Sequence, residues 1–180
     1  MTDAEHLKRM HPWLWERVAR AMRQWSAVAG PGESIRLVES VRPLETQQRY
    51  FAGGKSKADG VRRYSLHQFA PALAADVAVT RGRKYVASAA DPAWQRWGAA
   101  ARAEGLEWGG DWRGLVDCPH VQVPLLDRVQ LVQAAVGVAV DGQWGARTQA
   151  AVVAALPGVA LRPGSGWDSL TLDAWARILA

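Results

Sequence analysis

The sequence lacks several features that would assign it to a class of protein. Its single cysteine excludes an internal disulfide framework and fits synthesis in a reducing cytoplasm. No apolar run approaches the roughly 18 residues that a membrane helix needs, so we expect no stable membrane insertion. The first thirty residues are charged throughout and lack a clear cleavage site, so we expect no signal peptide. Internal repeats and low-complexity segments are also missing.

The sequence is long enough for one compact domain with a small appendage. It is also basic and rich in tryptophan. Its 180 residues include 22 Lys and Arg and 17 Asp and Glu, a formal net charge of +5. A basic surface attracts polyanions such as nucleic acid, anionic lipid or an anionic cell envelope, although a merely well-solvated basic surface is an equally good interpretation. Nucleic-acid binding rests on charge alone, because no base-reading motif is recognisable. We expect most of the ten tryptophans in the core and a few as a platform for sugars or peptides.

Hydrophobic periodicity predicts an α+β fold with a small antiparallel sheet, flanking helices and a helical C-terminal segment. The expected helices are 3–28 (interrupted or restarted at Pro12), 43–52, 92–104, 125–136, 146–156 and 169–179, and the expected strands are 34–41, 72–79 and 120–123. The residue pattern changes after Pro124, because the alternating and β-branched runs that predict strands almost disappear. We therefore expect two domains, 1–124 and 125–180.

Histidines are few, which narrows the search for a metal site. The sequence has four, of which His6 and His11 fall on the charged N-terminal helix and are expected at the surface. His67 and His120 both flank predicted strands. Taken alone, each is more often an ordinary hydrogen-bonded histidine than a metal ligand, so their surroundings must decide.

A carboxylate in a predicted apolar strand favours a metal-ligand role for these two histidines. Asp76 lies in the run "ALAADVAV", where an unpaired buried charge would be costly. If strands 72–79 and 120–123 are neighbours, Asp76 can converge with His67 and His120. Two imidazoles and one carboxylate fill three positions of a tetrahedral zinc site and leave the fourth open for water, as in catalytic zinc sites. The sequence therefore predicts Zn²⁺ as the cofactor.

A zinc-activated water needs a carboxylate to take and return its proton. Asp117, three residues before His120 in "DCPH", is well placed for this role. Glu107 and Asp111 are alternatives. Cys118 is a weaker candidate for a ligand or nucleophile, because it adjoins Pro119 and its side chain is expected to point away.

Three stretches resemble the M15 family of zinc peptidases. "SLHQFAPALAAD" resembles its Ser-x-His…Gly-x-Ala-x-Asp motif, and "EWGGDWRGLVDCPHVQ" is similar to the second motif of its L-alanyl-D-glutamate peptidase branch. "ESVRPLETQQRYFAGGKSK" is similar to the segment in which an arginine opens a helix that carries Gln-Gln and Tyr. The resemblance implies zinc on His67, Asp76 and His120 and a catalytic base at Asp117. It also implies that Arg42 contacts the substrate or the site, with Gln48 and Ser65 in support.

The match departs from the family pattern between the first histidine and the aspartate. Asp76 follows His67 by nine residues, two more than usual, and Ala70-Pro71 stands where a glycine is expected. A loop bulge before the strand would absorb two residues without changing the face of Asp76. The nearby rivals Asp59 and Asp91 do not lie in comparable apolar runs.

The C-terminal stretch "LLDRVQLVQAAVGVAVDGQWGARTQAAVVAAL" resembles the type 1, three-helix peptidoglycan-binding domain. Its signature is a helix with Val-Gln, then Val-Asp-Gly-x-Trp-Gly, then a helix that opens at Thr. The resemblance implies a wall-binding module over residues 125–180. The alternative is a helical cap packed on the catalytic domain.

Together these features predict a zinc peptidase that cleaves peptidoglycan stem peptides, with the L-Ala–D-Glu bond as the first choice. A D-Ala–D-Ala carboxypeptidase of the same family and a non-enzymatic wall-binding protein remain as alternatives. Small size, the basic charge and the missing signal peptide suit a monomeric phage endolysin, made in the host cytoplasm and released through a holin. The expected partner is bacterial peptidoglycan rather than nucleic acid or membrane.

Overall fold

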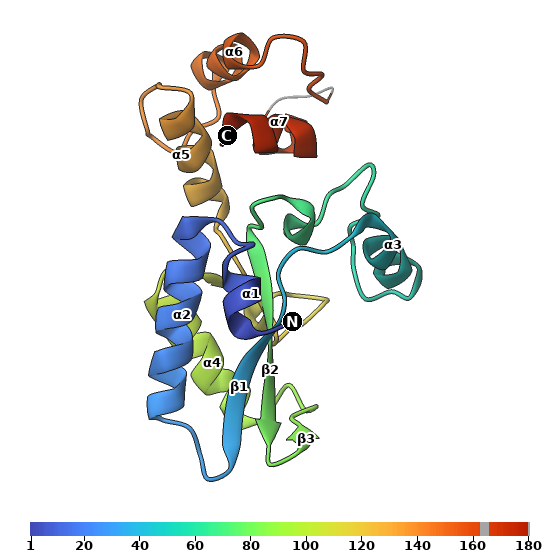
Figure 1. The fold of residues 1–180 in the computed structure, drawn as a ribbon, viewed down its shortest axis with the longest axis vertical. Coiled ribbons are helices and arrows are strands. Elements are labelled where there is room, and N and C mark those ends of the chain that lie inside the picture. The colour runs from blue at the N-terminus through green and yellow to red at the C-terminus, as the bar shows by residue number, and fades with distance from the viewer. Residues whose placement is uncertain (163–165, 180) are drawn as a thin grey trace.

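An antiparallel sheet forms the centre of the molecule (Figure 1), in a computed structural model that describes residues 1–162 and 166–179. The strand order is β1-β2-β5-β4, with β3 also paired to β2, and every pairing is antiparallel. The strands are β1 (Glu33–Glu39), β2 (Ala74–Arg81), β3 (Lys84–Tyr85), β4 (Glu107–Trp108) and β5 (His120–Gln122). The predicted α+β class and antiparallel sheet are confirmed.

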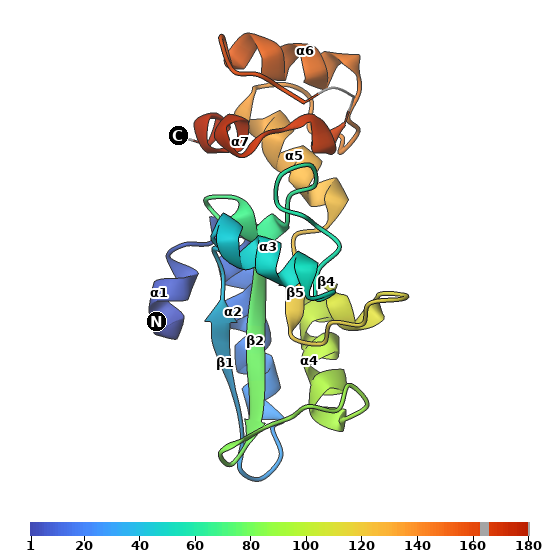
Figure 2. The same ribbon diagram turned by 90° about the vertical axis from the view of Figure 1, so that its right-hand side faces the viewer.

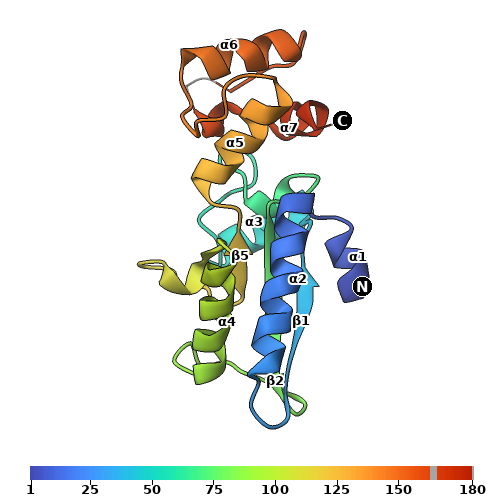
Figure 3. The same cartoon turned by 90° about the vertical axis from the view of Figure 1, so that its left-hand side faces the viewer.

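Helices cover the sheet and extend the molecule beyond it. They are α1 (Asp3–Leu7), α2 (Pro12–Ala27), α3 (Leu44–Ala52), α4 (Pro92–Ala103), α5 (Leu125–Ala135), α6 (Ala146–Ala155) and α7 (Leu172–Ile178), with short 3-10 turns η1 (Leu66–Gln68), η2 (Gly109–Asp111) and η3 (Trp167–Ser169). Helices α2 and α4 lie side by side on one face of the sheet (Figure 3), and α3 lies on the opposite side (Figure 2). No helix within the described residues is long and apolar enough to cross a membrane.

The break in the first predicted helix lies at Pro12, as expected. Proline fits the first turn of a helix because its missing N–H would have no intrahelical partner there. His11 caps α2 by accepting from the Trp13 N–H at 3.1 Å. The expectation that His6 lies at the surface is wrong: α1 packs against β1, and the buried His6 Nδ1 lies 3.1 Å from Ser40 Oγ.

Tryptophans supply much of the core, as predicted. Trp25 on α2 donates its indole N–H to the Ala93 carbonyl at 2.9 Å, which ties α2 to the start of α4. Trp108 of β4 packs directly on Gly98 of α4, where a Cβ would lie 2.3 Å from the indole ring. Only glycine permits this close approach between helix and strand. The two contacts lock the helical layer onto the sheet that carries the site.

Helices α5–α7 form a three-helix unit above the sheet (Figure 1), organised by one buried glutamine. The Gln133 amide donates to Asp141 Oδ1 at 2.7 Å and to the Gln143 carbonyl at 2.9 Å, and its Oε1 accepts from the Gly142 N–H at 2.9 Å. It also donates to Thr148 Oγ1 at 3.1 Å. The glutamine of the "VQ" element thus holds the "VDGQWG" loop in place through side-chain hydrogen bonds.

The three-helix unit shares a hydrophobic core with the rest of the chain. Trp167 and Trp175 belong to the same buried cluster as the sheet residues. Phe69, in the loop before β2, packs against both rings, with centroid separations of 5.7 and 5.9 Å. The Trp175 indole N–H donates to the Pro71 carbonyl at 3.1 Å. The segment beyond Pro124 is therefore packed on the loop that leads into β2.

Candidate metal centre and substrate cleft

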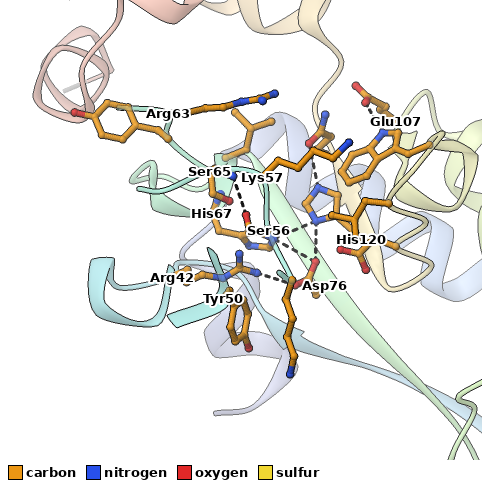
Figure 4. A pocket seen from close by; sticks show the side chains of 18 of the residues that line it. Arg42, Tyr50, Ser56, Lys57, Arg63, Ser65, His67, Asp76, Glu107 and His120 are labelled. Carbon is orange, nitrogen blue, oxygen red and sulfur yellow. Dashed lines mark hydrogen bonds and ion pairs between the residues drawn. The ribbon is translucent and has the colours of Figure 1, made fainter. Parts of the chain in front are cut away.

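The predicted metal ligands meet on the sheet. The register between β2 and β5 sets Asp76 directly opposite His120, and opposed side chains in an antiparallel pair share a face. His67 reaches the same point from η1. One ligand atom from each of the three residues lies within 4.8 Å of the others. The predicted convergence of the two strands is confirmed, and the three side chains point toward one another (Figure 4).

The second nitrogen of each imidazole is already engaged. His67 Nδ1 lies 2.8 Å from the Ser40 carbonyl oxygen, and His120 Nε2 lies 3.0 Å from Gln122 Oε1. An imidazole that donates one N–H to an oxygen presents its other nitrogen as a metal ligand. His67 Nε2 and His120 Nδ1 are left, and each lies near Asp76 Oδ1, at 3.2 and 2.9 Å. Two nitrogens and one carboxylate oxygen are a donor set that suits zinc.

The outer oxygen of Asp76 is held by an arginine. Arg42 donates from its NH2 group to Asp76 Oδ2 at 3.1 Å and from Nε to Glu39 Oε2 at 2.7 Å. Its guanidinium lies over the Tyr50 ring, 4.7 Å from the centroid. The arginine is 7 % exposed, so it is a fixed part of the site wall. Arg42 therefore orients Asp76 so that Oδ1 faces the histidines (Figure 4).

The electrostatics of the three residues favour a cation between them. Burial by itself raises the pKa of the Asp76 carboxyl, but the charges and hydrogen bonds of His67 and His120 outweigh it and hold that pKa well below its usual range. Burial opposes charge on His120, yet its hydrogen bond to Asp76 raises the pKa of that imidazole. The Asp76 carboxylate and the two imidazoles therefore stabilise positive charge at the point where their ligand atoms meet. These interactions with His67 and His120 offset the free-energy cost of burying the Asp76 carboxylate.

The supporting glutamine is Gln47, not Gln48. Gln47 is fully buried on α3, and its Oε1 accepts from the Arg42 NH1 group at 2.9 Å. Gln48 is exposed on the outer side of the helix and does not line the cleft. Ser65 lines the cleft and caps η1, where its hydroxyl accepts from the His67 N–H at 3.4 Å. Ser65 thus positions a ligand rather than only facing substrate.

Asp117 lines the cleft beside the three ligands. Its backbone is fixed from both sides: its N–H donates to the Gly109 carbonyl at 3.0 Å, and its carbonyl accepts from the His120 N–H at 3.1 Å. Gly109 approaches so closely that a Cβ there would lie 2.5 Å from the Asp117 carbonyl oxygen. Burial and the negative charge of Asp76 raise the pKa of the Asp117 carboxyl. A raised pKa brings a carboxylate closer to the range in which it can both accept and return a proton.

The other candidates for ligand or base have separate partners. Asp111 is exposed and paired with Arg102, and Glu107, which does line the cleft, accepts from the Trp112 indole N–H at 2.8 Å. The buried thiol of Cys118 lies outside the cleft lining, and burial raises its pKa. Two more carboxylates serve local structure: Asp59 accepts three backbone N–H groups, and Asp91 caps α4.

The two extra residues between His67 and Asp76 lie in a loop, as the sequence analysis expects. The Ala70–Pro71 peptide bond is cis. Ala72 then joins the N-terminal segment, because its N–H donates to the Arg9 carbonyl and its carbonyl accepts from the His11 N–H, each at 2.9 Å. The loop is absorbed before β2 begins at Ala74, so Asp76 keeps its face toward the ligands.

The site opens into a cleft of about 1240 Å³. Trp112 forms part of its wall and lies against His120, with ring centroids 4.9 Å apart. Trp112 is thus a tryptophan that faces the cleft rather than the core. Basic side chains from the loop after α3, among them Lys57 and Arg63, lie around the opening (Figure 4). The cleft is therefore large enough for a peptide and suited to an anionic one.

Comparisons with known proteins agree with this site. The M15 peptidase family model described as D-alanyl-D-alanine carboxypeptidase matches residues 59–123. The L-alanyl-D-glutamate peptidase of Listeria phage A118 is 32% identical over 106 residues, which are 58% of this chain and 34% of that protein. The chain thus spans about a third of the length of that relative.

A solved structure extends the similarity beyond the matched segment. The L-Ala D-Glu endopeptidase ChiX of Serratia marcescens superposes with a TM-score of 0.52 at 25% identity, over 71% of this chain and 90% of that one. The family match contains His67, Asp76, Asp117 and His120, and these residues form the floor of the cleft. The segment that carries the site, residues 59–123, is thus similar to the M15 peptidases.

Proposed function

We propose that the chain is a zinc-dependent peptidase that cleaves the L-Ala–D-Glu bond in the stem peptides of bacterial peptidoglycan. The observation that carries the proposal is the convergence of His67, Asp76 and His120 within 4.8 Å on the floor of a peptide-sized cleft. The bond assignment is supported by the phage and Serratia relatives, whose names state that specificity. The basic cleft supports an acidic substrate.

His67 Nε2, Asp76 Oδ1 and His120 Nδ1 would hold the zinc ion. Zinc bound there acts as a Lewis acid and lowers the pKa of water toward about 7. Ser40 and Gln122 fix the two imidazole rings, and Arg42 fixes Asp76. Three protein donors would leave a coordination position of the zinc for water, as in catalytic zinc sites.

Asp117 acts as the proton carrier in this proposal. Its carboxylate takes a proton from the attacking water and returns it to the amine of the leaving peptide. The backbone bonds to Gly109 and His120 hold the Asp117 main chain next to the candidate ligand His120. Trp112 covers His120 and limits the access of bulk water to the ligand side of the cleft.

The test is mass spectrometry of a stem-peptide digest. Purified protein is loaded with zinc and incubated with L-Ala–γ-D-Glu–L-Lys–D-Ala–D-Ala, and a matched sample is treated with chelator. The proposal expects free L-Ala and the remaining tetrapeptide in the first sample only. Release of D-Ala instead would favour the carboxypeptidase alternative, which the description of the family model supports. No cleavage together with firm binding to purified sacculi would favour a non-enzymatic wall-binding protein.

Residues 125–180 are proposed to form a helical module that packs on the catalytic part of the chain and also binds the wall. The support is the "VDGQWG" loop, clamped by Gln133 between α5 and α6. Residues 1–124 would form the catalytic domain. By analogy with the phage relative, we propose a monomeric endolysin that is made in the host cytoplasm and reaches the wall through a holin.

A further inference from the structure

The substrate cleft has walls from both parts of the chain. Most of its lining comes from the sheet, η1 and the loops after α3 and β4. The three-helix unit and its loops contribute five of the lining residues: Arg128, Arg162, Trp167, Asp168 and Leu170. The cleft that holds the candidate metal site is therefore incomplete without the C-terminal segment.

The lining of the cleft carries more positive than negative side chains. Its cations are Arg42, Lys55, Lys57, Arg62, Arg63, Arg113, Arg128 and Arg162, and its carboxylates are Asp76, Glu107, Asp117 and Asp168. Two of the cations are occupied by the fold. Arg42 binds Glu39 and Asp76, and Arg162 donates to the Arg62 and Val61 carbonyls while lying over the Tyr64 ring.

Arg128 differs from these two because its Nε finds no acceptor among residues 1–162 and 166–179. It lies on the first helix of the C-terminal unit, and its guanidinium carbon is 5.5 Å from the centroid of the Trp167 ring. Its Nε is buried and has no hydrogen-bond partner among the described residues. A buried donor without an acceptor is costly unless a ligand supplies the acceptor.

The acidic groups near Arg128 leave it free for a ligand. Glu107 and Asp168 are the nearby carboxylates, and neither forms an ion pair with Arg128 in the part of the chain that the structure describes. Burial lowers the pKa of Arg128, but an arginine remains a cation at neutral pH. The planar guanidinium, stacked near Trp167, matches a carboxylate in geometry and charge.

We propose that the C-terminal segment completes the substrate cleft and that Arg128 binds a carboxylate of the acidic stem peptide. The inference rests on the proposed function, since it names how that substrate is held. Arg128 is then a specificity residue: it contacts the peptide away from the scissile bond and favours peptides with free carboxylates over amidated ones. The helical segment thus has a role at the cleft besides any binding to the wall.

The test compares two soluble peptides in the full-length, zinc-loaded protein. One is L-Ala–γ-D-Glu–L-Lys with free carboxylates, and the other has the same sequence with both carboxylates converted to primary amides. Arg128→Gln should raise KM for the acidic peptide about 10- to 100-fold, the range for losing a hydrogen bond to a charged group, with little change in kcat. The amidated peptide should show the same KM with both proteins. Arg128→Lys should recover part of the discrimination.

Control variants and a binding assay separate the possible failures. Arg177→Gln removes an exposed arginine of the same segment that does not line the cleft, and it should change neither KM. Calorimetric binding of both peptides to Asp117→Asn reports affinity without turnover. Equal losses on the acidic and amidated peptides, or no loss, would overturn the role of Arg128 while cleavage by the parent protein upholds the proposed function. If the parent protein neither binds nor cleaves either peptide, the proposed function fails and this inference fails with it.

Discussion

Replacing Trp175 by alanine tests whether the C-terminal helices are part of one cooperative structure. Trp175 is fully buried on α7 and packs against Trp167, Phe69 and His11, with ring centroids 5.3, 5.9 and 6.0 Å away. Its indole N–H also donates to the Pro71 carbonyl. The substitution removes the side chain that joins α7 to the loop before β2.

The expected loss of stability is large. Truncating a buried tryptophan to alanine costs about 3–5 kcal/mol through lost burial and the cavity that remains. The Pro71 carbonyl loses its donor, which adds about 1 kcal/mol. The sum, about 4–6 kcal/mol, is a major part of the roughly 5–15 kcal/mol that holds a typical protein folded. For a chain of this length it corresponds to a fall in Tm of about 10–20 °C.

Urea unfolding, followed by tryptophan fluorescence and far-UV circular dichroism, measures this loss. Trp175→Phe is the matched control, since it keeps an aromatic ring in the core while it removes the indole N–H and part of the ring volume, and it should cost about 1–3 kcal/mol, less than the alanine variant. We expect one transition that shifts to lower urea in both variants. Two transitions, with the larger one unmoved by Trp175→Ala, would refute the shared core and make residues 125–180 an independent module.

Three further predictions concern the site itself. Asp117→Asn should retain zinc and lose activity by about 10²–10⁴-fold. In the metal-free protein a carbon-detected NMR titration should give Asp117 a pKa above the ordinary aspartate value, so that the ionised base is lost at a higher pH than for an ordinary aspartate. Full activity of Asp117→Asn, or a lowered pKa, would move the base elsewhere. Gly109→Ala should reduce turnover about 10²-fold because its Cβ must displace the Asp117 carbonyl, whereas Gly145→Ala, with open space around its Cβ, should not; equal activities would contradict the close packing. His67→Ala and His120→Ala should each lose most bound zinc by elemental analysis, and a variant that keeps both full zinc and full activity would exclude that histidine as a ligand.

Much of the fold follows from local patterns. The strands β1 and β2 are long enough for alternation or β-branched residues to mark them, and Pro12 marks the start of α2. The two-residue strand β4 lies in a stretch that predicts a loop, because its conformation comes from pairing with β5. The last helix begins at Leu172, later than expected, where the Thr171 side chain caps it by accepting from the Ala174 N–H.

The candidate metal ligands are easier to predict from the sequence than the neighbouring groups that orient their side chains. His67, Asp76 and His120 are recognisable because each is a metal-binding residue type beside an apolar strand. The carbonyl of Ser40, which orients His67, has no signature in a side-chain pattern. The choice between Gln47 and Gln48 depends on the rotational phase of α3, which a one-residue error turns by about 100°.

Local sequence patterns also do not predict that Arg128 lies at the cleft. Its helix was predicted, and its arginine is ordinary in a basic chain. Long-range contacts, among them Trp175 to Pro71 and Arg162 to the Arg62 carbonyl, bring the C-terminal unit over the cleft. Such contacts join residues that are far apart in sequence, so no local pattern encodes them.

The central claim is that His67, Asp76 and His120 hold zinc, and anomalous X-ray scattering measured on both sides of the zinc absorption edge tests it most directly. Crystals of the zinc-loaded protein should show one strong peak at about 2.0–2.2 Å from His67 Nε2, Asp76 Oδ1 and His120 Nδ1. The Arg42 contact to Asp76 Oδ2 should persist. A peak bound by Asp117 or Glu107 in place of Asp76, with the Asp76 carboxylate turned to solvent, would contradict the account.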